Sequence, residues 1–137
     1  NGAALYIPQK QDLLSPVDLG RFIRRHAITK TFITTALFNQ LVEQDPESLR
    51  SFEKIYFGGQ EASLRSVRRA AEIVGYDGKL VNAYGPTETT TFATYQPVTE
   101  AHLPAGRLPI GRPISNTSVV VVDKHGQPLP PGIQGEL

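Results

Sequence analysis

Residues 79–88 read KLVNAYGPTE, a short apolar run that passes directly into a Gly-Pro turn. Residues 52–60, FEKIYFGGQ, show a similar pattern, a β-prone run that ends in two glycines. Between them, residues 63–74 have the spacing of an amphipathic helix, which stops at Gly75. A strand, a helix and a second strand in this order favour two parallel strands in one sheet.

The same alternation extends toward the N-terminus. Residues 29–34 (TKTFIT) are rich in β-branched side chains and predict a strand, and residues 36–44 predict a helix. Residues 15–28 begin with an N-cap serine followed by proline, so they predict a further helix. Residues 3–8 are expected to form a short buried strand. The predicted fold class is therefore α/β, a parallel sheet flanked by helices, with ligands beyond the carboxyl ends of its strands.

The composition changes after about Pro97, where the chain becomes rich in proline and glycine. The last stretch, SVVVVDKHGQPLPPGIQGEL, predicts a β-hairpin with its turn at residues 124–126 and a further strand at its end. We expect residues 1–100 to form part of an α/β subdomain, and residues 101–137 to begin a β-rich subdomain.

Composition excludes several classes of protein. The formal net charge of +1 and the 20% of charged residues argue against binding nucleic acid through bulk charge and against disorder. The absence of cysteine excludes disulfides and a thiolate nucleophile. No apolar run is long enough to cross a membrane, and no secretory leader is evident, so a cytoplasmic location is expected. Because the chain also lacks methionine, it is expected to be an internal piece of a longer protein.

The two glycine-bearing strand ends, near residues 56–61 and 82–88, are expected at the same edge of a parallel sheet. There Tyr84 offers a flat face, Thr87 a hydroxyl, and Glu88 a hard oxygen suited to Mg²⁺. These groups indicate a nucleotide site. The same residues fit a turn followed by a capped helix start equally well, and the residues alone leave both interpretations open.

Four motifs in order resemble a known family: FGGQ, NAYGPTE, PIGRPISNT and VVVVDKHGQPLPPGIQGEL. They are similar to landmarks of adenylation domains from nonribosomal peptide synthetases, within the adenylate-forming superfamily of acyl-CoA synthetases and luciferases. The resemblance runs from about Ile28 to the end of the chain. Asn82 and Pro86 are more typical of the amino-acid-activating branch. The chain thus resembles an internal fragment of such a domain.

The resemblance implies ATP and Mg²⁺ as cofactors, with Thr87 and Glu88 as the catalytic residues. Tyr84 would stack on the adenine, Thr87 would bond the α-phosphate, and Glu88 would ligate Mg²⁺. The rest of the purine slot would come from Asn82 and from the backbone around Gly58, Gly59 and Ala83.

The implied reaction is attack of an amino-acid carboxylate on the α-phosphorus of ATP, which gives an aminoacyl-adenylate and pyrophosphate. Because both reactants are anionic, catalysis must neutralise charge and align them, and no covalent enzyme nucleophile is needed. The aminoacyl group would then pass as a thioester to the phosphopantetheine of a downstream carrier-protein domain, in the same chain or a partner chain. Nucleic acid and membrane are not expected as partners.

The resemblance also implies a pocket for a small amino-acid substrate. Its lining carries no charge, so an ionic or amide side chain would lose hydration there at a cost of about 1–3 kcal/mol. Aromatic rings narrow the pocket and small residues leave some room, which favours a branched aliphatic substrate, valine or isoleucine. The implied lining residues are Phe32, Tyr56, Gly58, Ala83, Thr91 and Phe92.

Two alternatives stay open: a fatty-acyl or aryl acid:CoA ligase of the same superfamily, and a non-catalytic nucleotide-binding module. The family's phosphate loop, amino-group-binding aspartate, ribose-binding aspartate and catalytic lysine would all lie outside this sequence. The chain alone is therefore expected to be inactive. Two helices also carry arginines that either form a solvated face or bind a polyanion: Arg21, Arg24 and Arg25, and Arg65, Arg68 and Arg69.

Overall fold

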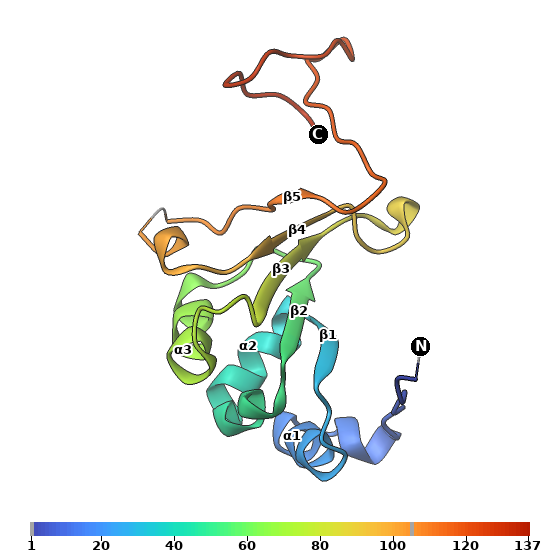
Figure 1. Ribbon diagram of the computed structural model, residues 1–137, viewed down its shortest axis with the longest axis vertical. Helices are drawn as coiled ribbons and strands as arrows, with labels where there is room; N and C mark the ends of the chain where they lie inside the picture. Colours follow the sequence, from blue (N-terminus) through green and yellow to red (C-terminus); the bar gives the residue numbers. More distant parts are fainter. Residues whose placement is uncertain (1, 105) are drawn as a thin grey trace.

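The computed structural model describes residues 2–104 and 106–137, which form a five-stranded sheet with three α-helices packed on one side (Figure 1). The strand order follows the chain, β1-β2-β3-β4-β5. The first three strands are parallel, as predicted, whereas the last two are antiparallel, so the sheet is mixed. The strands are β1 (Lys30–Thr34), β2 (Lys54–Gly58), β3 (Leu80–Tyr84), β4 (Thr94–Pro97) and β5 (Arg112–Pro113).

Each α-helix begins at a hydroxyl that accepts a hydrogen bond from a backbone N–H of the first turn. These N-caps are Ser15, Thr34 and Ser63, and they satisfy amide groups that the helix itself leaves unpaired. None of the helices in residues 2–104 and 106–137 combines the length and the apolar character that a membrane span requires. The helices are α1 (Pro16–Arg25), α2 (Thr35–Gln44) and α3 (Leu64–Val74), with 3-10 turns η1 (Lys10–Leu13), η2 (Pro46–Ser51), η3 (Thr87–Thr89) and η4 (Glu100–His102).

The core lies between the helices and one face of the sheet. Because side chains alternate along a strand, Ile55 and Phe57 of β2 point into this core, and Tyr56 points to the opposite face. Phe57 stacks on Phe38 of α2, with the ring centroids 4.4 Å apart. Phe32 is paired with Tyr56 in register and lies on the same face as it. The face away from the helices therefore carries aromatic side chains.

The prediction of a buried strand at residues 3–8 is wrong. The segment forms no strand, and Leu5 and Ile7 are 86% and 79% exposed. A strand requires a partner for its backbone groups, and this segment instead lies against α1, where the Tyr6 ring is 4.9 Å from the ring of His26. The β-prone composition of these residues does not show whether a neighbouring strand is available to pair with them.

The predicted turn of the C-terminal hairpin is confirmed, but its strands are reduced to isolated bridges. The Gly126 N–H donates to the Asp123 carbonyl, and Val122 bridges to Pro128 and to Glu136. Prolines have no N–H to donate, so Pro128 and the two prolines at 130–131 limit the ladder. This segment extends away from the sheet (Figure 1). The division at residue 100 stays a prediction.

Candidate nucleotide and substrate site

The carboxyl ends of β2 and β3 approach so closely that one position accepts only glycine. Gly58 is paired in register with Ala83, and a Cβ at Gly58 would collide with the carbonyl oxygen of Ala83. Gly59 then takes a φ of 91°, a left-handed conformation that favours glycine. The two glycines of the FGGQ motif therefore have different structural roles. Gly58 allows the close approach of β2 and β3, and Gly59 allows the chain to turn.

A buried hydroxyl holds this glycine turn in place. The Thr35 Oγ1, at the start of α2, lies 3.1 Å from the carbonyl oxygens of both Gly58 and Gln60. Thr35 is 2% exposed, so its hydroxyl satisfies carbonyl groups with little access to water. Thr35 was not among the predicted site residues. Its position directly after β1 could have signalled it, because the carboxyl ends of parallel strands share one edge.

A cavity of about 430 Å³ opens beside these strand ends. That volume falls within the range of sites for small molecules and cofactors. Four of the five residues predicted to form the purine slot line it, Gly59, Asn82, Ala83 and Tyr84, together with Glu61, Arg107 and neighbouring residues. Glu61 and Arg107 were not among the predicted residues.

The far wall of the cavity comes from the proline-rich linker after η4. Asn82 is 7% exposed, and its Nδ2 donates a 2.9 Å hydrogen bond to the carbonyl oxygen of Pro109. Thr94 of β4 donates from Oγ1 to the carbonyl oxygen of Ile110 at 2.6 Å. Two side chains from adjacent strands therefore fasten the linker across the sheet edge, which gives the cavity its shape.

The Gly-Pro-Thr-Glu motif forms a single 3-10 turn, η3, with Thr87 and Glu88 both exposed. After this turn the chain folds back, and the Ala93 N–H donates to the Tyr84 carbonyl at 2.8 Å. A Cβ at Gly85 would lie 2.6 Å from the Ala93 nitrogen, so glycine is needed for this closure. The turn that the turn-and-helix interpretation predicted is therefore present. The helix that the same interpretation predicted is limited to the single 3-10 turn within residues 87–93.

The predicted substrate residues converge on the sheet face away from the helices. The Phe92 ring lies 4.9 Å from that of Phe32, edge to face, and 6.4 Å from that of Tyr56. Gly58 and Ala83 follow on the same face, two residues beyond Tyr56 and Val81 in their strands. Thr91 is exposed next to Phe92. Phe32, Tyr56 and Phe92 thus form an uncharged aromatic cluster, on the sheet face that also carries Gly58 and Ala83.

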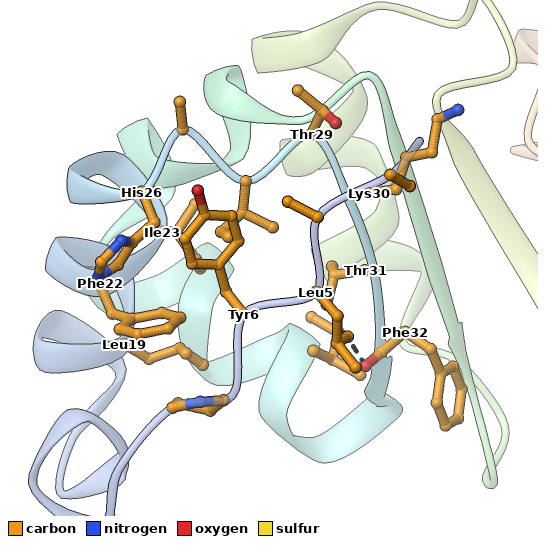
Figure 2. Close-up of a pocket in the computed structure, with 16 residues that line it drawn as sticks. Leu5, Tyr6, Leu19, Phe22, Ile23, His26, Thr29, Lys30, Thr31 and Phe32 are labelled. Carbon is orange, nitrogen blue, oxygen red and sulfur yellow. Dashed lines mark hydrogen bonds between the residues drawn. The ribbon is translucent and has the colours of Figure 1, made fainter. Parts of the chain in front are cut away.

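A larger cavity, about 590 Å³, lies elsewhere, between the N-terminal segment, α1 and β1 (Figure 2). Leu5, Tyr6, Phe22 and Ile23 are among its lining residues. Figure 2 shows the Phe32 ring pointing away from the Tyr6 side of this cavity. Phe32 also lines this cavity, whereas none of the other residues predicted for the nucleotide or substrate site does.

Glu88 is the predicted Mg²⁺ ligand. Within residues 2–104 and 106–137, no three His, Cys, Asp or Glu side chains are grouped so that they could hold a metal ion. Mg²⁺ is commonly bound by one or two carboxylates together with substrate phosphates. Glu88 does not line the cavity, but it is exposed and follows the lining residue Pro86 by two positions, so its single carboxylate fits a metal ion that would arrive with a nucleotide.

A mixed sheet with a cavity at glycine-bearing strand ends is compatible with nucleotide binding, and similarity to known proteins defines the class. The chain belongs to the AMP-binding enzyme family, whose profile matches residues 1–137. The predicted resemblance to adenylation domains of nonribosomal peptide synthetases is also confirmed. The chain is 37% identical to PA1221, described as an NRPS protein containing adenylation and PCP domains. It superimposes on that structure with a TM-score of 0.77 over 87% of this chain and 24% of the other.

Several curated relatives match the whole of this chain. It is 47% identical over 137 residues to surfactin synthase subunit 1 of Bacillus subtilis (strain 168), and spans 4% of that protein. It is 43% identical over 137 residues to bacitracin synthase 1 of Bacillus licheniformis, and spans 3% of it. The chain therefore corresponds to a small part of the relatives that it matches.

Proposed function

We propose that this chain forms part of an adenylation domain that activates an amino acid with ATP as an aminoacyl-adenylate. The observation that supports this most directly is the placement of two sites around one loop. Tyr84 borders the 430 Å³ cavity, and Phe92, at the other end of the loop, lies in the aromatic cluster. The exposed Thr87 and Glu88 lie between them in the chain. A nucleotide and a carboxylic acid held on either side would meet at this loop.

The residues of this chain would contribute positioning and charge. Tyr84 is 41% exposed at the cavity, so a ring face is accessible for stacking on adenine. The Thr87 hydroxyl would donate to an α-phosphate oxygen, and Glu88 would hold Mg²⁺. When bound, Mg²⁺ would neutralise the phosphate charge that opposes attack by a carboxylate. Holding the two reactants in line would lower the barrier further by removing their freedom of orientation.

The proposed substrate is a branched aliphatic amino acid, valine or isoleucine. The sheet face offers three aromatic rings, from Phe32, Tyr56 and Phe92, and two small residues. None of these carries a charge that could pair with an ionic side chain. A difference of one methylene is worth only about 1–3 kcal/mol in such a pocket, so closely related aliphatic amino acids are expected to compete.

The activated amino acid is proposed to pass to a carrier protein. The thiolate of a phosphopantetheine group would attack the acyl carbon, forming a carbon–sulfur bond as the bond to the AMP oxygen breaks. The similarity to a protein described as containing adenylation and PCP domains supports this step. The carrier domain would belong to the same protein or to a partner.

The decisive test is amino-acid-dependent exchange of pyrophosphate into ATP, measured on the protein as it is encoded, with any flanking sequence. A panel of the twenty amino acids, together with fatty and aryl acids, should give exchange with valine or isoleucine. Preference for a charged or amide amino acid would contradict the proposed substrate. Exchange only with a fatty or aryl acid would indicate a CoA ligase, and nucleotide binding without any exchange would indicate a non-catalytic module.

A matched pair of variants tests the role of Glu88. Glu88→Gln keeps the shape of the side chain and removes its charge, so exchange should fall by roughly 10²-fold and require more Mg²⁺. Glu100→Gln makes the same change at another exposed glutamate, in η4, and should leave exchange unchanged. If the two variants changed exchange equally, Glu88 would not be part of the proposed site.

A further inference from the structure

Two consecutive residues of the loop between η3 and β4 have an unusual backbone conformation. Thr90 has a φ of 58° and Thr91 a φ of 82°, both in the left-handed region. Glycine occupies that region readily, but a β-branched residue does so rarely, because its side chain crowds the backbone. Such a conformation persists only where the surrounding structure enforces it, and it is typical of functional segments.

The surrounding structure fixes this loop at both ends. The Thr90 N–H donates to the Thr87 carbonyl at 3.0 Å, which closes η3. At the other end, the Ala93 N–H donates to the Tyr84 carbonyl, and Gly85 has no room for a Cβ against Phe92 and Ala93. The chain must therefore reverse direction within residues 90–91.

The reversal has a direct consequence for the aromatic cluster. Residue 92 is the first after the two left-handed residues, and its ring lies 4.9 Å from the Phe32 ring. A residue at position 90 that could not adopt a positive φ would send the chain out of η3 in another direction. Phe92 would then leave its place between Phe32 and Tyr56.

We propose that Thr90 is a positioning residue, whose left-handed backbone holds Phe92 in the substrate pocket and thereby sets amino-acid selectivity. The inference rests on the proposed function, and it assigns a role to a residue that has no place in the predicted site. Its side chain is exposed, so the role belongs to the backbone conformation rather than to the hydroxyl. One turn then links the phosphate-facing residues Thr87 and Glu88 to the substrate-facing Phe92.

The test compares three substitutions at Thr90 in the protein as it is encoded. Thr90→Pro cannot adopt a positive φ, whereas Thr90→Asn and Thr90→Gly can. The measured quantity is the ratio of kcat/KM for the preferred amino acid to that for the next best one in the exchange panel. Thr90→Pro should reduce this ratio by roughly tenfold, because displacement of a pocket side chain disturbs substrate alignment. Thr90→Asn should retain most of the selectivity ratio of the unaltered protein.

A matched control separates the positioning of Phe92 from a general loss of stability. Ala27, at the end of α1, also has a positive φ, of 48°, and its N–H also donates to the carbonyl three residues earlier. Ala27→Pro therefore makes the same backbone change outside the loop that carries Phe92. It should lower thermal stability while leaving the selectivity ratio unchanged. An unchanged ratio in Thr90→Pro, or an equal loss in Thr90→Gly, would overturn the inference.

A structural readout makes the result independent of catalysis. Nuclear Overhauser contacts between the Phe92 and Phe32 rings should be present in the unaltered protein and in Thr90→Asn, and lost in Thr90→Pro. If the unaltered protein activates no amino acid, the proposed function fails, and these contacts still decide whether Thr90 positions Phe92. Persistence of the contacts in Thr90→Pro would overturn the inference even in an active enzyme.

Discussion

The side chain of Asn82 is joined to the carbonyl of Pro109 by a hydrogen bond of 2.9 Å, which ties β3 to the linker that precedes β5. The two residues are 27 positions apart in the chain. Because the linker forms one wall of the 430 Å³ cavity proposed to bind the nucleotide, this bond connects the stability of the sheet edge to the shape of that cavity.

Replacement of Asn82 by alanine should therefore weaken both folding and nucleotide binding. We expect the free energy of unfolding to fall by about 1–2 kcal/mol, because a nearly buried hydrogen bond is lost. The affinity for ATP should fall as well, since the linker is released from the cavity wall. Gln96→Ala is the control, because its amide also donates to a backbone carbonyl, at Pro97. Urea unfolding and calorimetric titration measure the two effects, and an unchanged ATP affinity in Asn82→Ala would contradict this role.

Thr35→Val should loosen the glycine turn without changing the size of the side chain. Two carbonyl oxygens, of Gly58 and Gln60, would lose their hydroxyl partner, at an expected cost of about 1–3 kcal/mol of unfolding free energy. Amide hydrogen exchange at residues 59–61 should become faster. Thr31→Val is the control in β1, where the hydroxyl reaches only the neighbouring carbonyl, at 3.5 Å. Equal rates of amide exchange at residues 59–61 in Thr35→Val and Thr31→Val would show that Thr35 does not hold the turn.

Phe92→Leu and Phe38→Leu should separate substrate selectivity from stability. Phe92 lies in the aromatic cluster on the face away from the helices, so its replacement should enlarge the pocket and shift preference toward a larger amino acid. Phe38 is fully buried and stacks on Phe57, so its replacement should cost roughly 1–3 kcal/mol of stability and leave the preference unchanged. The exchange panel and thermal unfolding provide the measurements. A shift of preference in Phe38→Leu alone would refute this assignment.

The start of α1 should make stability depend on pH in the acid range. The Ser15 hydroxyl donates to the Asp18 carboxylate at 2.7 Å, and this bond, followed by the one from Arg21, lowers the pKa of Asp18 below its ordinary value of 3.8. The folded state therefore favours the ionised form. The stability that the ionised Asp18 carboxylate adds to the folded state is complete above pH 3.8, and it is lost as the pH falls through the pKa of Asp18 in the folded state.

Two variants test this pH dependence. Asp18→Asn should reduce stability at neutral pH, and its difference from the unaltered protein should disappear at the acid end. Ser15→Ala should move the pKa of Asp18 back toward its ordinary value, because the main cause of the shift is removed. Carboxyl titration by NMR measures the second effect directly. A pKa that does not change in Ser15→Ala would show that Arg21 alone controls it.

Local patterns in the sequence predicted the elements that depend on local interactions. The cap at Ser15, the helix end at Gly75 and the strand that enters the Gly-Pro turn were all confirmed. Each of these depends on backbone preferences and side-chain period within a few residues, which a sequence displays directly. The glycines of the FGGQ motif also marked a real close approach between strands.

Elements that depend on distant partners were not predicted in the same way. Residues 3–8 have the composition of a strand but lie against α1 without strand pairing, while β4 pairs antiparallel with β3 and was not expected. The role of Thr35 was likewise not predicted: its place after β1 indicates the correct sheet edge, but its hydrogen-bond acceptors lie 23 and 25 residues away.

By itself, the sequence of this protein determined the α/β class, the family, and the residue types gathered at two strand ends. Only the tertiary structure decided which sheet face carries Phe32, Tyr56 and Phe92, and how the linker closes the cavity through Asn82. The reason is physical. Propensity and periodicity act within a few residues, whereas strand register and the close approach of strands are fixed by hydrogen bonds and packing between segments far apart in the chain.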